Sequence, residues 1–320
     1  MKRVLITGGT GFIGANLARR MLADGHDVYL LVRPNHATWR IDEIQNDVHL
    51  REVDLNDHEK LQGVIGGIRP EWVFHLAAHG AYSWQTDACQ IAETNFIGTI
   101  NLVMACLKAG FESFINTGSS SEYGFKDHPP TETEWLEPNS NYAVAKASAT
   151  LFCRHTAQAT KTRITTLRLY SVYGGYEEPH RLIPTLIVHG LAGKLPPLVN
   201  PEVARDYIYI GDVINAYTLC ARDNREIFGS VYNVGTGIQT TLRDVVGIAR
   251  QALGIGDEPQ WGTMPTRSWD TTCWVADSHC IQEELGWRAS HSFKQGFNLT
   301  LGWFQTNQRF LNFYTNAIAF

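Results

Sequence analysis

The sequence predicts an α/β protein with a doubly wound parallel sheet and a smaller C-terminal lobe. Short apolar runs alternate with helical stretches through the first half of the chain. A glycine-rich turn joins the first apolar run to the first helix, and after residue 170 the pattern loosens into loops rich in Gly and Pro. Nearly continuous apolar strands that alternate with helices are typical of a parallel sheet covered on both faces.

The expected strands are short, apolar and rich in β-branched residues. The first begins at Arg3 or Val4, and the others cover residues 28–32, 48–53, 72–77, 113–117 and 164–170. Helical spacing of apolar residues predicts helices over 12–24, 60–65, 91–109 and 142–158. Ligands of such sheets bind beyond the carboxyl ends of the strands, so the functional residues are expected there.

The second half of the chain is expected to be mainly a substrate-binding lobe. We predict a dinucleotide-binding domain over 1–171 and this lobe over 172–320, with parts of 205–236 returning to the first domain. Residues 207–210 and 231–234 have the pattern of strands that rejoin or border the main sheet.

Composition and charge favour a globular enzyme. The chain has 320 residues, 44% hydrophobic and 18% charged, which excludes a disordered protein. A net charge of −5 gives no reason to expect nucleic acid or an anionic membrane as partner. The cysteines are scattered without a Cys-x-x-Cys pattern, so no metal site is expected. No apolar run is long enough to span a membrane and no signal peptide precedes the first strand, so we expect a cytoplasmic protein.

The first strand–helix turn predicts a dinucleotide site. Gly8, Gly11 and Gly14 form a G-x-x-G-x-x-G pattern directly behind the apolar run 4–6. Such a turn brings the backbone close to a pyrophosphate, which binds at the helix N-terminus. Glycines also occur at ordinary turns, but the strand before and the helix after favour the binding function. The expected cofactor contacts are Gly8, Gly11, Phe12, Ile13 and Gly14.

A tyrosine and a lysine form a candidate proton-transfer pair. Tyr142 and Lys146 are four residues apart on a predicted helix, so they share a face. A free tyrosine has a pKa of about 10, and a nearby ammonium is expected to lower it. Ser119 ends the fifth strand and is the third candidate, although serine is also common in ordinary turns. A lone Tyr-x-x-x-Lys pair is usually a solvated surface feature, but the serine and the glycine turn favour catalysis.

Taken together, the ordered motifs resemble the extended short-chain dehydrogenases/reductases, in the superfamily of nucleotide-sugar epimerases, dehydratases and reductases. The resemblance covers nearly the whole chain. It rests on residues 7–14, 54–55, 75–78, 95, 119–124, 142–146, 168–174, 205–212, 233–236 and 285–287. It implies a Rossmann domain, a nicotinamide cofactor and a nucleotide-diphosphate (NDP) sugar as substrate.

The resemblance also implies roles for the three candidate residues. Tyr142 would be the acid/base at the sugar hydroxyl or ketone, Lys146 would also bind the nicotinamide ribose, and Ser119 would hydrogen-bond the reacting oxygen. Family 4,6-dehydratases carry a carboxylate just after this serine to eliminate water. Here Ser120 and Ser121 follow and Glu122 comes one step too late, so dehydratase activity is not expected.

The end of the second strand bears on the choice of cofactor. NAD-binding relatives usually place an acid there, about 20 residues after the glycines, to hold the ribose 2′-hydroxyl. Here Arg33 takes the place, and an arginine binds a 2′-phosphate well. Arg40 would add a second contact, whereas the alternative is that Arg33 is a solvated loop residue. We therefore expect NADP, with NAD possible. The remaining cofactor contacts are expected at Asp54, Leu55, Ala77 and Ala78.

The substrate side rests mostly on the resemblance. Arg205, Arg267 and Asp270 fall where the family grips the diphosphate and nucleoside, although surface salt bridges are the alternative for such residues. The loop after the fourth strand is expected to face the sugar, or else to pack in the core. The residues of this loop that are expected near the sugar are His79, Tyr82 and Trp84. Ser120, which follows Ser119, is also expected to bind substrate.

Two further features concern the substrate contacts and the oligomer. Ser171 stands where relatives commonly have Asn, which puts one usual substrate hydrogen bond in doubt. Helices 95–109 and 142–158 correspond to those that pair in family dimers, so a homodimer is expected. Their apolar residues are divided between that interface and the sheet, and they are Ile100, Leu102, Met104, Leu151 and Phe152.

We expect an NADP-dependent oxidoreductase that acts on an NDP-hexose, most plausibly reducing an NDP-4-keto-6-deoxyhexose at C4. The alternative is an NDP-hexose 4-epimerase with tightly bound NAD, because the same Ser119, Tyr142 and Lys146 serve both reactions. Arg33 favours the reductase, since tightly held NAD is commoner among epimerases. Two further alternatives are a reductase of aromatic or steroid ketones and a non-catalytic dinucleotide-binding regulator; the complete catalytic set speaks against the regulator.

Overall fold

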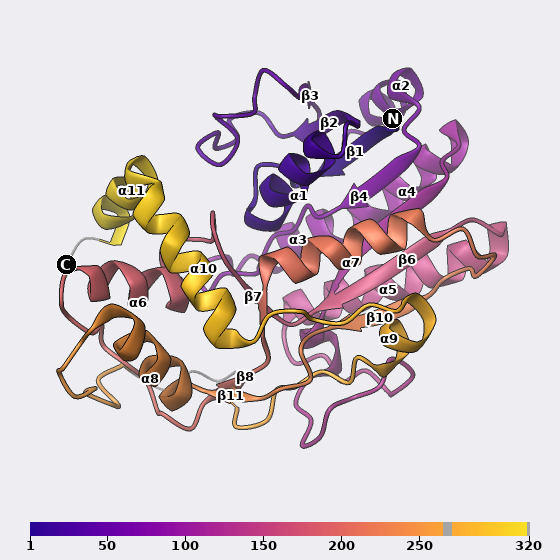
Figure 1. Cartoon of the computed structure of the whole chain (residues 1–320). Helices are drawn as coiled ribbons and strands as arrows, with labels where there is room; N and C mark the ends of the chain where they lie inside the picture. Colours follow the sequence, from indigo (N-terminus) through magenta and orange to yellow (C-terminus); the bar gives the residue numbers. More distant parts are fainter. Residues whose placement is uncertain (265–270, 319–320) are drawn as a thin grey trace.

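A seven-stranded parallel sheet forms the centre of the computed structural model, which describes residues 1–264 and 271–318 (Figure 1). The strands lie in the order β10-β6-β5-β4-β1-β2-β3. Their bounds are β1 Arg3–Thr7, β2 Asp27–Val32, β3 His49–Glu52, β4 Trp72–His75, β5 Ser113–Ser119, β6 Ile164–Leu169 and β10 Val231–Val234.

Helices cover both faces of this sheet. On one face lie α1 (Phe12–Ala23) and α7 (Ile210–Arg222), and on the other lie α2 (His58–Ile68), α4 (Gly98–Ala109) and α5 (Asn141–Thr160) (Figure 1). Successive side chains of a strand point to opposite faces. Val4 and Ile6 accordingly belong to one core cluster and Leu5 to the other. The expected doubly wound α/β fold is thereby confirmed.

The helix expected over residues 91–109 is a composite. It consists of α3 (Ala88–Ala92), the π-helical turn η1 (Glu93–Ile97) and α4. The buried Asn95 lies in this π turn, accepts from His79 N at 2.9 Å and donates to His79 O at 2.6 Å. The wide turn thus places an amide side chain that holds the loop after β4, and π turns are frequent at functional sites.

Strand β4 ends at His75, two residues earlier than expected. The amides of Leu76 and Ala77 donate to Thr7 Oγ1 at 3.2 and 3.1 Å, and that of Leu76 also donates to Thr7 O. Because the threonine side chain draws these amides toward the end of β1, the chain turns out of the ladder with β5 here. The loop after β4 is therefore tied to the glycine-rich turn.

The C-terminal lobe has its own small core. Its helices are α6 (Leu182–Leu191), α8 (Leu242–Leu253), α10 (Phe293–Thr306) and α11 (Gln308–Ile318). Two small sheets border it: β7 (Ser171–Tyr173) pairs in parallel with β9 (Tyr207–Tyr209), and β8 (Ala204–Arg205) pairs antiparallel with β11 (Thr240–Thr241). Aromatic and aliphatic side chains such as Tyr173, Val246, Phe297 and Phe304 fill its interior.

The two parts are interwoven along the chain. Strand β10 pairs with β6 and α9 (His279–Leu285) packs on β10, although both follow the first part of the lobe in sequence. Residues 231–234 thus return to the main sheet, and 207–209 form a bordering strand. The division at residue 171 stays a prediction. Among the described residues, none of the helices combines the length and apolar character needed to cross a bilayer.

Candidate active site

The glycine-rich turn packs so closely on neighbouring backbone that Gly8 and Gly14 leave no space for a side chain. Gly8 has φ +67°, and a Cβ on it would lie 2.7 Å from Ala77 N. A Cβ on Gly14 would lie 2.2 Å from Gly8 O. The N-cap of α1, Gly11, supplies no side-chain cap, so no side chain satisfies the amides that open the helix at Phe12 and Ile13. Free amides at a helix N-terminus fit a dinucleotide phosphate.

The three candidate catalytic residues come together at the carboxyl end of the sheet. Ser119 is the last residue of β5, and the side chain of Ser140 caps α5 by accepting from Ala143 N at 3.1 Å. Tyr142 and Lys146 follow on the first two turns of that helix. Tyr142 is half-buried and close enough to the Ser119 side chain for that side chain to lower its pKa, whereas Lys146 is buried.

The electrostatics of this group differ from expectation. Burial raises the pKa of Tyr142 to about 12, and the hydrogen bond with Ser119 offsets only part of the rise. Burial also lowers the pKa of Lys146, against the opposing charge of Glu122. The expected lowering of the tyrosine pKa by Lys146 is therefore wrong for the protein without cofactor. Desolvation has a larger effect on the Tyr142 pKa than the nearby charges. The cation that lowers this pKa is Arg181.

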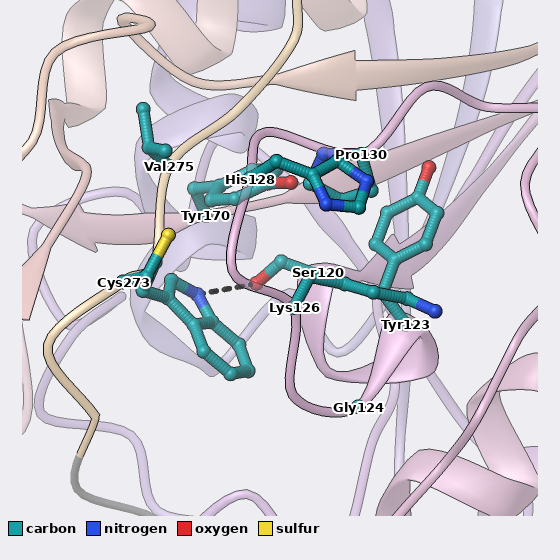
Figure 2. A pocket seen from close by; sticks show the side chains of 10 residues that line it. Ser120, Tyr123, Gly124, Lys126, His128, Pro130, Tyr170, Cys273 and Val275 are labelled. Atoms are coloured by element: carbon teal, nitrogen blue, oxygen red, sulfur yellow. Dashed lines mark hydrogen bonds between the residues drawn. The ribbon is translucent and has the colours of Figure 1, made fainter.

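No carboxylate follows Ser119 where a dehydratase would carry one. Ser121 Oγ lies 2.7 Å from Ser119 Oγ, and Ser120 Oγ accepts from Trp274 Nε1 at 3.1 Å (Figure 2). Glu122 is completely buried and pairs with Arg168, its Oε2 lying 2.8 Å from Nε. The side chain of Glu122 therefore points into the protein interior, where it pairs with Arg168.

Ser120 opens onto a small pocket between the two parts of the molecule (Figure 2). The segment after β5, residues 120–130, supplies one side together with Tyr170, and residues 273–275 of the lobe supply the other. The buried Tyr170 hydroxyl in this pocket has no hydrogen-bond partner among the described residues. The lining residues are Ser120, Tyr123, Gly124, Lys126, His128, Pro130, Tyr170, Cys273, Trp274 and Val275.

Trp274 is a site residue that the sequence reasoning missed. Trp274 donates a hydrogen bond to Ser120, and its ring also lies under the Arg205 guanidinium. The distance from Arg205 Cζ to the ring centroid is 5.4 Å. Arg205 itself donates to Ala204 O at 2.7 Å. The tryptophan therefore connects the serine segment with the arginine expected to bind diphosphate. No motif marked it, and its position close behind Arg267 and Asp270 was the available signal. Those two residues lie outside the described part of the chain.

The two arginines proposed for a 2′-phosphate have different surroundings. Arg33 is exposed at the end of β2, and its charge, together with burial, lowers the pKa of His79 on the loop after β4. Arg40 is buried and donates to Tyr176 O at 2.8 Å and to Glu178 Oε2 at 2.9 Å. The expected second phosphate contact from Arg40 is therefore wrong, because its guanidinium is occupied in packing the lobe.

The other expected cofactor contacts lie at the same edge of the sheet. Asp54 is exposed and accepts from Asn56 N at 2.8 Å, so its side chain braces the local turn. Leu55 is buried and its carbonyl accepts from Asn101. Ala77 is half-buried and Ala78 is exposed, which leaves the backbone after β4 open to a ligand.

The loop after β4 lies beside Tyr142. Tyr82 stacks on Trp84 with ring centroids 4.8 Å apart and planes 6° apart, and Trp84 in turn meets His180 edge-on. Tyr82 acts on the pKa of Tyr142, and a Cβ on Gly80 would lie 3.4 Å from the Tyr142 ring. His79 is half-buried in the same loop. These residues border the space beside the Tyr142 ring.

The outer faces of α4 and α5 are partly apolar. Met104 and Leu151 are exposed, and Ile100 and Phe152 are partly covered. Leu102 is completely buried against the sheet, so it is unavailable to a partner.

Comparison with known proteins adds the family. Residues 4–235 match the family model described as "NAD dependent epimerase/dehydratase family". The chain is 28% identical to a UDP-glucose 4-epimerase of Mycolicibacterium smegmatis, over 96% of this chain and 100% of that protein. It is 27% identical to a dTDP-glucose 4,6-dehydratase of Streptomyces griseus, over 95% and 94%. The Thermus thermophilus UDP-glucose 4-epimerase in complex with NAD superimposes with a TM-score of 0.83 at 29% identity, over 95% and 99%.

Proposed function

Because the chain belongs to the NAD dependent epimerase/dehydratase family, whose members here are enzymes of nucleotide sugars, we propose that it is an NDP-hexose 4-epimerase that retains NAD. The sequence alone favours the NADP-dependent reductase and leaves the epimerase as the alternative. The relatives are named epimerases and dehydratases, and one of the solved structures holds NAD. Both support the epimerase over the reductase.

The observation that carries the proposal is the Ser119–Tyr142 contact flanked by serines. A 4,6-dehydratase needs an acid to eliminate water from the sugar, and Ser120 and Ser121 hold no ionisable group there. The nearest carboxylate along the chain, that of Glu122, is buried against Arg168. The machinery that remains exchanges a hydroxyl and a ketone at one carbon, which is the chemistry of an epimerase or a reductase.

The chain's own residues handle the proton of that exchange. Tyr142 in its basic form takes the proton from the C4 hydroxyl, and it returns the proton to the oxygen after the ketone has presented its other face. Ser119 donates to the same oxygen and keeps it within reach of the phenol. A bound nicotinamide supplies the hydride acceptor and donor and, in its oxidised form, a positive charge that favours the Tyr142 phenolate. Lys146 is expected to bind the ribose of that nicotinamide.

The lobe supplies the features for holding a nucleotide diphosphate. Arg205 lies on β8 with Trp274 beneath it, and an arginine fork matches phosphate oxygens. Trp274 also touches Ser120. A sugar attached to a diphosphate at Arg205 would therefore extend along Trp274 toward Ser119 and Tyr142.

The test is to purify the protein, identify any retained cofactor by mass spectrometry, and supply UDP-glucose and dTDP-glucose without added cofactor. Interconversion with the C4 epimer, without net formation of NADH or NADPH, is the expected result. An empty protein that converts neither sugar but oxidises NADPH with an NDP-4-keto-6-deoxyhexose would overturn the proposal.

That second outcome is the other candidate function, NADPH-dependent reduction at C4. One observation favours it: the exposed Arg33 stands at the end of β2 where an acid would hold the ribose of NAD. An arginine there is compatible with NAD, whereas an acid would repel the 2′-phosphate of NADP. The two reactions differ in stoichiometry, because only the reductase consumes one NADPH per product.

The homodimer stays a prediction that we retain. Ile97, Met104, Val144 and Leu151 are exposed on the adjoining helical segments around α4 and α5. Light scattering of the purified protein and of Leu151→Glu tests whether this face closes a dimer. A cytoplasmic location also stays a prediction.

A further inference from the structure

Glu122 connects the elements that carry the three catalytic residues. Its Oε1 accepts from the backbone amide of Ser119 at 2.8 Å, so it fixes the last residue of β5. The same oxygen accepts from Thr150 Oγ1 at 3.1 Å, one turn beyond Lys146 on α5. Its Oε2 accepts from Arg168 Nε on β6 at 2.8 Å.

The place for this carboxylate exists because residue 118 is glycine. A Cβ on Gly118 would lie 2.7 Å from Glu122 Oε1 and 2.9 Å from Thr166 Cγ2. No side chain fits there without displacing the carboxylate. Gly118 and Glu122 therefore depend on each other: the missing side chain of Gly118 leaves the space that the Glu122 carboxylate occupies.

Glu122 also provides the negative charge near Lys146. The titratable groups coupled to Lys146 are Glu122 from the turn η2 (Ser120–Tyr123), Cys153 from α5 and His75 from β4. Burial raises the pKa of Cys153 to about 12 and lowers that of His75 to about 3, so both are neutral at pH 7. Glu122 is the member of the set that forms an ion pair, with Arg168, and it opposes the effect of desolvation on the Lys146 pKa.

We propose that Glu122 is a positioning residue that fixes the backbone of Ser119 and, through Thr150, joins it to the helix that carries Lys146, where it places a carboxylate one turn from the lysine. It does not touch substrate, because it is completely buried. Arg168 holds it from behind and is itself held by Tyr123, whose hydroxyl lies 2.7 Å from Arg168 Nη1 and 2.8 Å from Asn233 Oδ1. The catalytic serine and lysine are thus coupled through one anion.

The lysine half of the proposal is tested without substrate. NMR titration of the intact protein labelled with [ε-13C]lysine follows Lys146, whose signal is assigned with Lys146→Arg. The variant Glu122→Gln/Arg168→Gln removes both charges of the pair and avoids leaving one buried ion alone. The Lys146 midpoint is expected to fall by about one pH unit or more. Tyr123→Phe is the matched control, because it perturbs the same buried network and leaves the carboxylate charged.

A double variant that titrates Lys146 at the wild-type midpoint overturns the proposal, and so does an equal shift in Tyr123→Phe. The serine half rests on the proposed function and uses Glu122→Asp. The shorter side chain keeps the charge but withdraws from Ser119 N, so kcat is expected to fall on the order of 10-fold with KM little changed. An unchanged kcat in Glu122→Asp refutes the proposed role of Glu122 at Ser119. If the double variant does not fold, this kcat measurement alone decides whether the proposal stands. If the wild-type protein has no epimerase activity, the proposed function is refuted. The Lys146 titration still tests the role of Glu122, because it needs no substrate.

Discussion

Trp274 Nε1 donates to Ser120 Oγ at 3.1 Å, so a tryptophan of the C-terminal lobe reaches the residue next to Ser119. Ser120 is buried at the end of β5, whereas Trp274 belongs to the segment that leads into α9. This hydrogen bond therefore joins the tryptophan that lies beneath Arg205 to the carboxyl end of β5. Changes in the lobe should be felt at Ser119 through this contact.

Replacing Trp274 by Phe tests that connection. The variant loses the indole N–H but keeps an aromatic ring beneath Arg205. Loss of a hydrogen bond costs about 0.5–1.5 kcal/mol, which corresponds to a rise in KM of roughly 2–10-fold for the sugar nucleotide. Steady-state kinetics measures the rise, and Trp261→Phe in the same lobe is the control. An unchanged KM would show that the bond to Ser120 does not contribute to substrate binding.

Replacing Tyr142 by Phe should remove the acid/base group. Turnover is expected to fall by a factor on the order of 10² or more, while folding and cofactor affinity stay nearly intact. Burial raises the pKa of Tyr142 to about 12, so Tyr142 is a phenol at neutral pH. Removal of the C4 proton therefore requires the phenolate that the positive charge of an oxidised nicotinamide favours. Rapid-quench assays and cofactor titration check both halves. A folded variant with wild-type turnover excludes the assignment.

Replacing Arg33 by Ala distinguishes the two cofactors. If Arg33 binds a 2′-phosphate, NADPH affinity should fall by about 1.5–3 kcal/mol, typical of a hydrogen bond to a charged group, with little change for NADH. Fluorescence titration of both cofactors measures the difference. If Arg33 is a solvated residue beside bound NAD, as the epimerase proposal implies, the variant loses equally little affinity for either cofactor.

Replacing Glu177 by Gln should remove a pH dependence of stability. Glu177 is buried, its Oε2 has no hydrogen-bond partner in the described part of the chain, and burial raises its pKa to about 8. An ordinary glutamate has a pKa of about 4.3, so between these values the folded chain holds a proton that the unfolded chain has released. The free energy of unfolding must then fall as pH rises from about 4.5 to 8 and level off above.

Urea unfolding of wild type and Glu177→Gln between pH 5 and pH 9 measures this slope. The variant is expected to lack the part of the decline that belongs to residue 177, and to be the more stable protein at the alkaline end. Parallel curves for the two proteins would show that Glu177 titrates normally.

Local sequence patterns predicted the central architecture well. The strands have continuous apolar runs, and the glycine turn has a strand before it and a helix after it, so the order of elements could be predicted without tertiary information. Element ends were harder. Strand β4 ends early because Thr7, far away in sequence, accepts from Leu76 and Ala77, and the π turn at Asn95 depends on its bonds to His79.

The parts of the site that escaped prediction depend on long-range neighbours. Arg40 lies only seven residues from Arg33, yet its guanidinium is taken by Tyr176 and Glu178 across the fold. The lowering expected for the Tyr142 pKa considered charge alone, whereas burial is the larger effect. Trp274 acquires its place only when the lobe meets β5, and Glu122 only when β5, β6 and α5 come together.

Strand β10 has a consequence for how the protein is made. The edge strand β10 is formed by residues 231–234 and pairs with β6. During synthesis, α5 and β6 are therefore complete long before β10 leaves the ribosome. Until then β6 offers a row of free amides and carbonyls, which is the kind of edge on which chains pair with one another. Expression of residues 1–171 alone should therefore give an aggregation-prone fragment. Supplying the remainder as a separate polypeptide should restore its solubility.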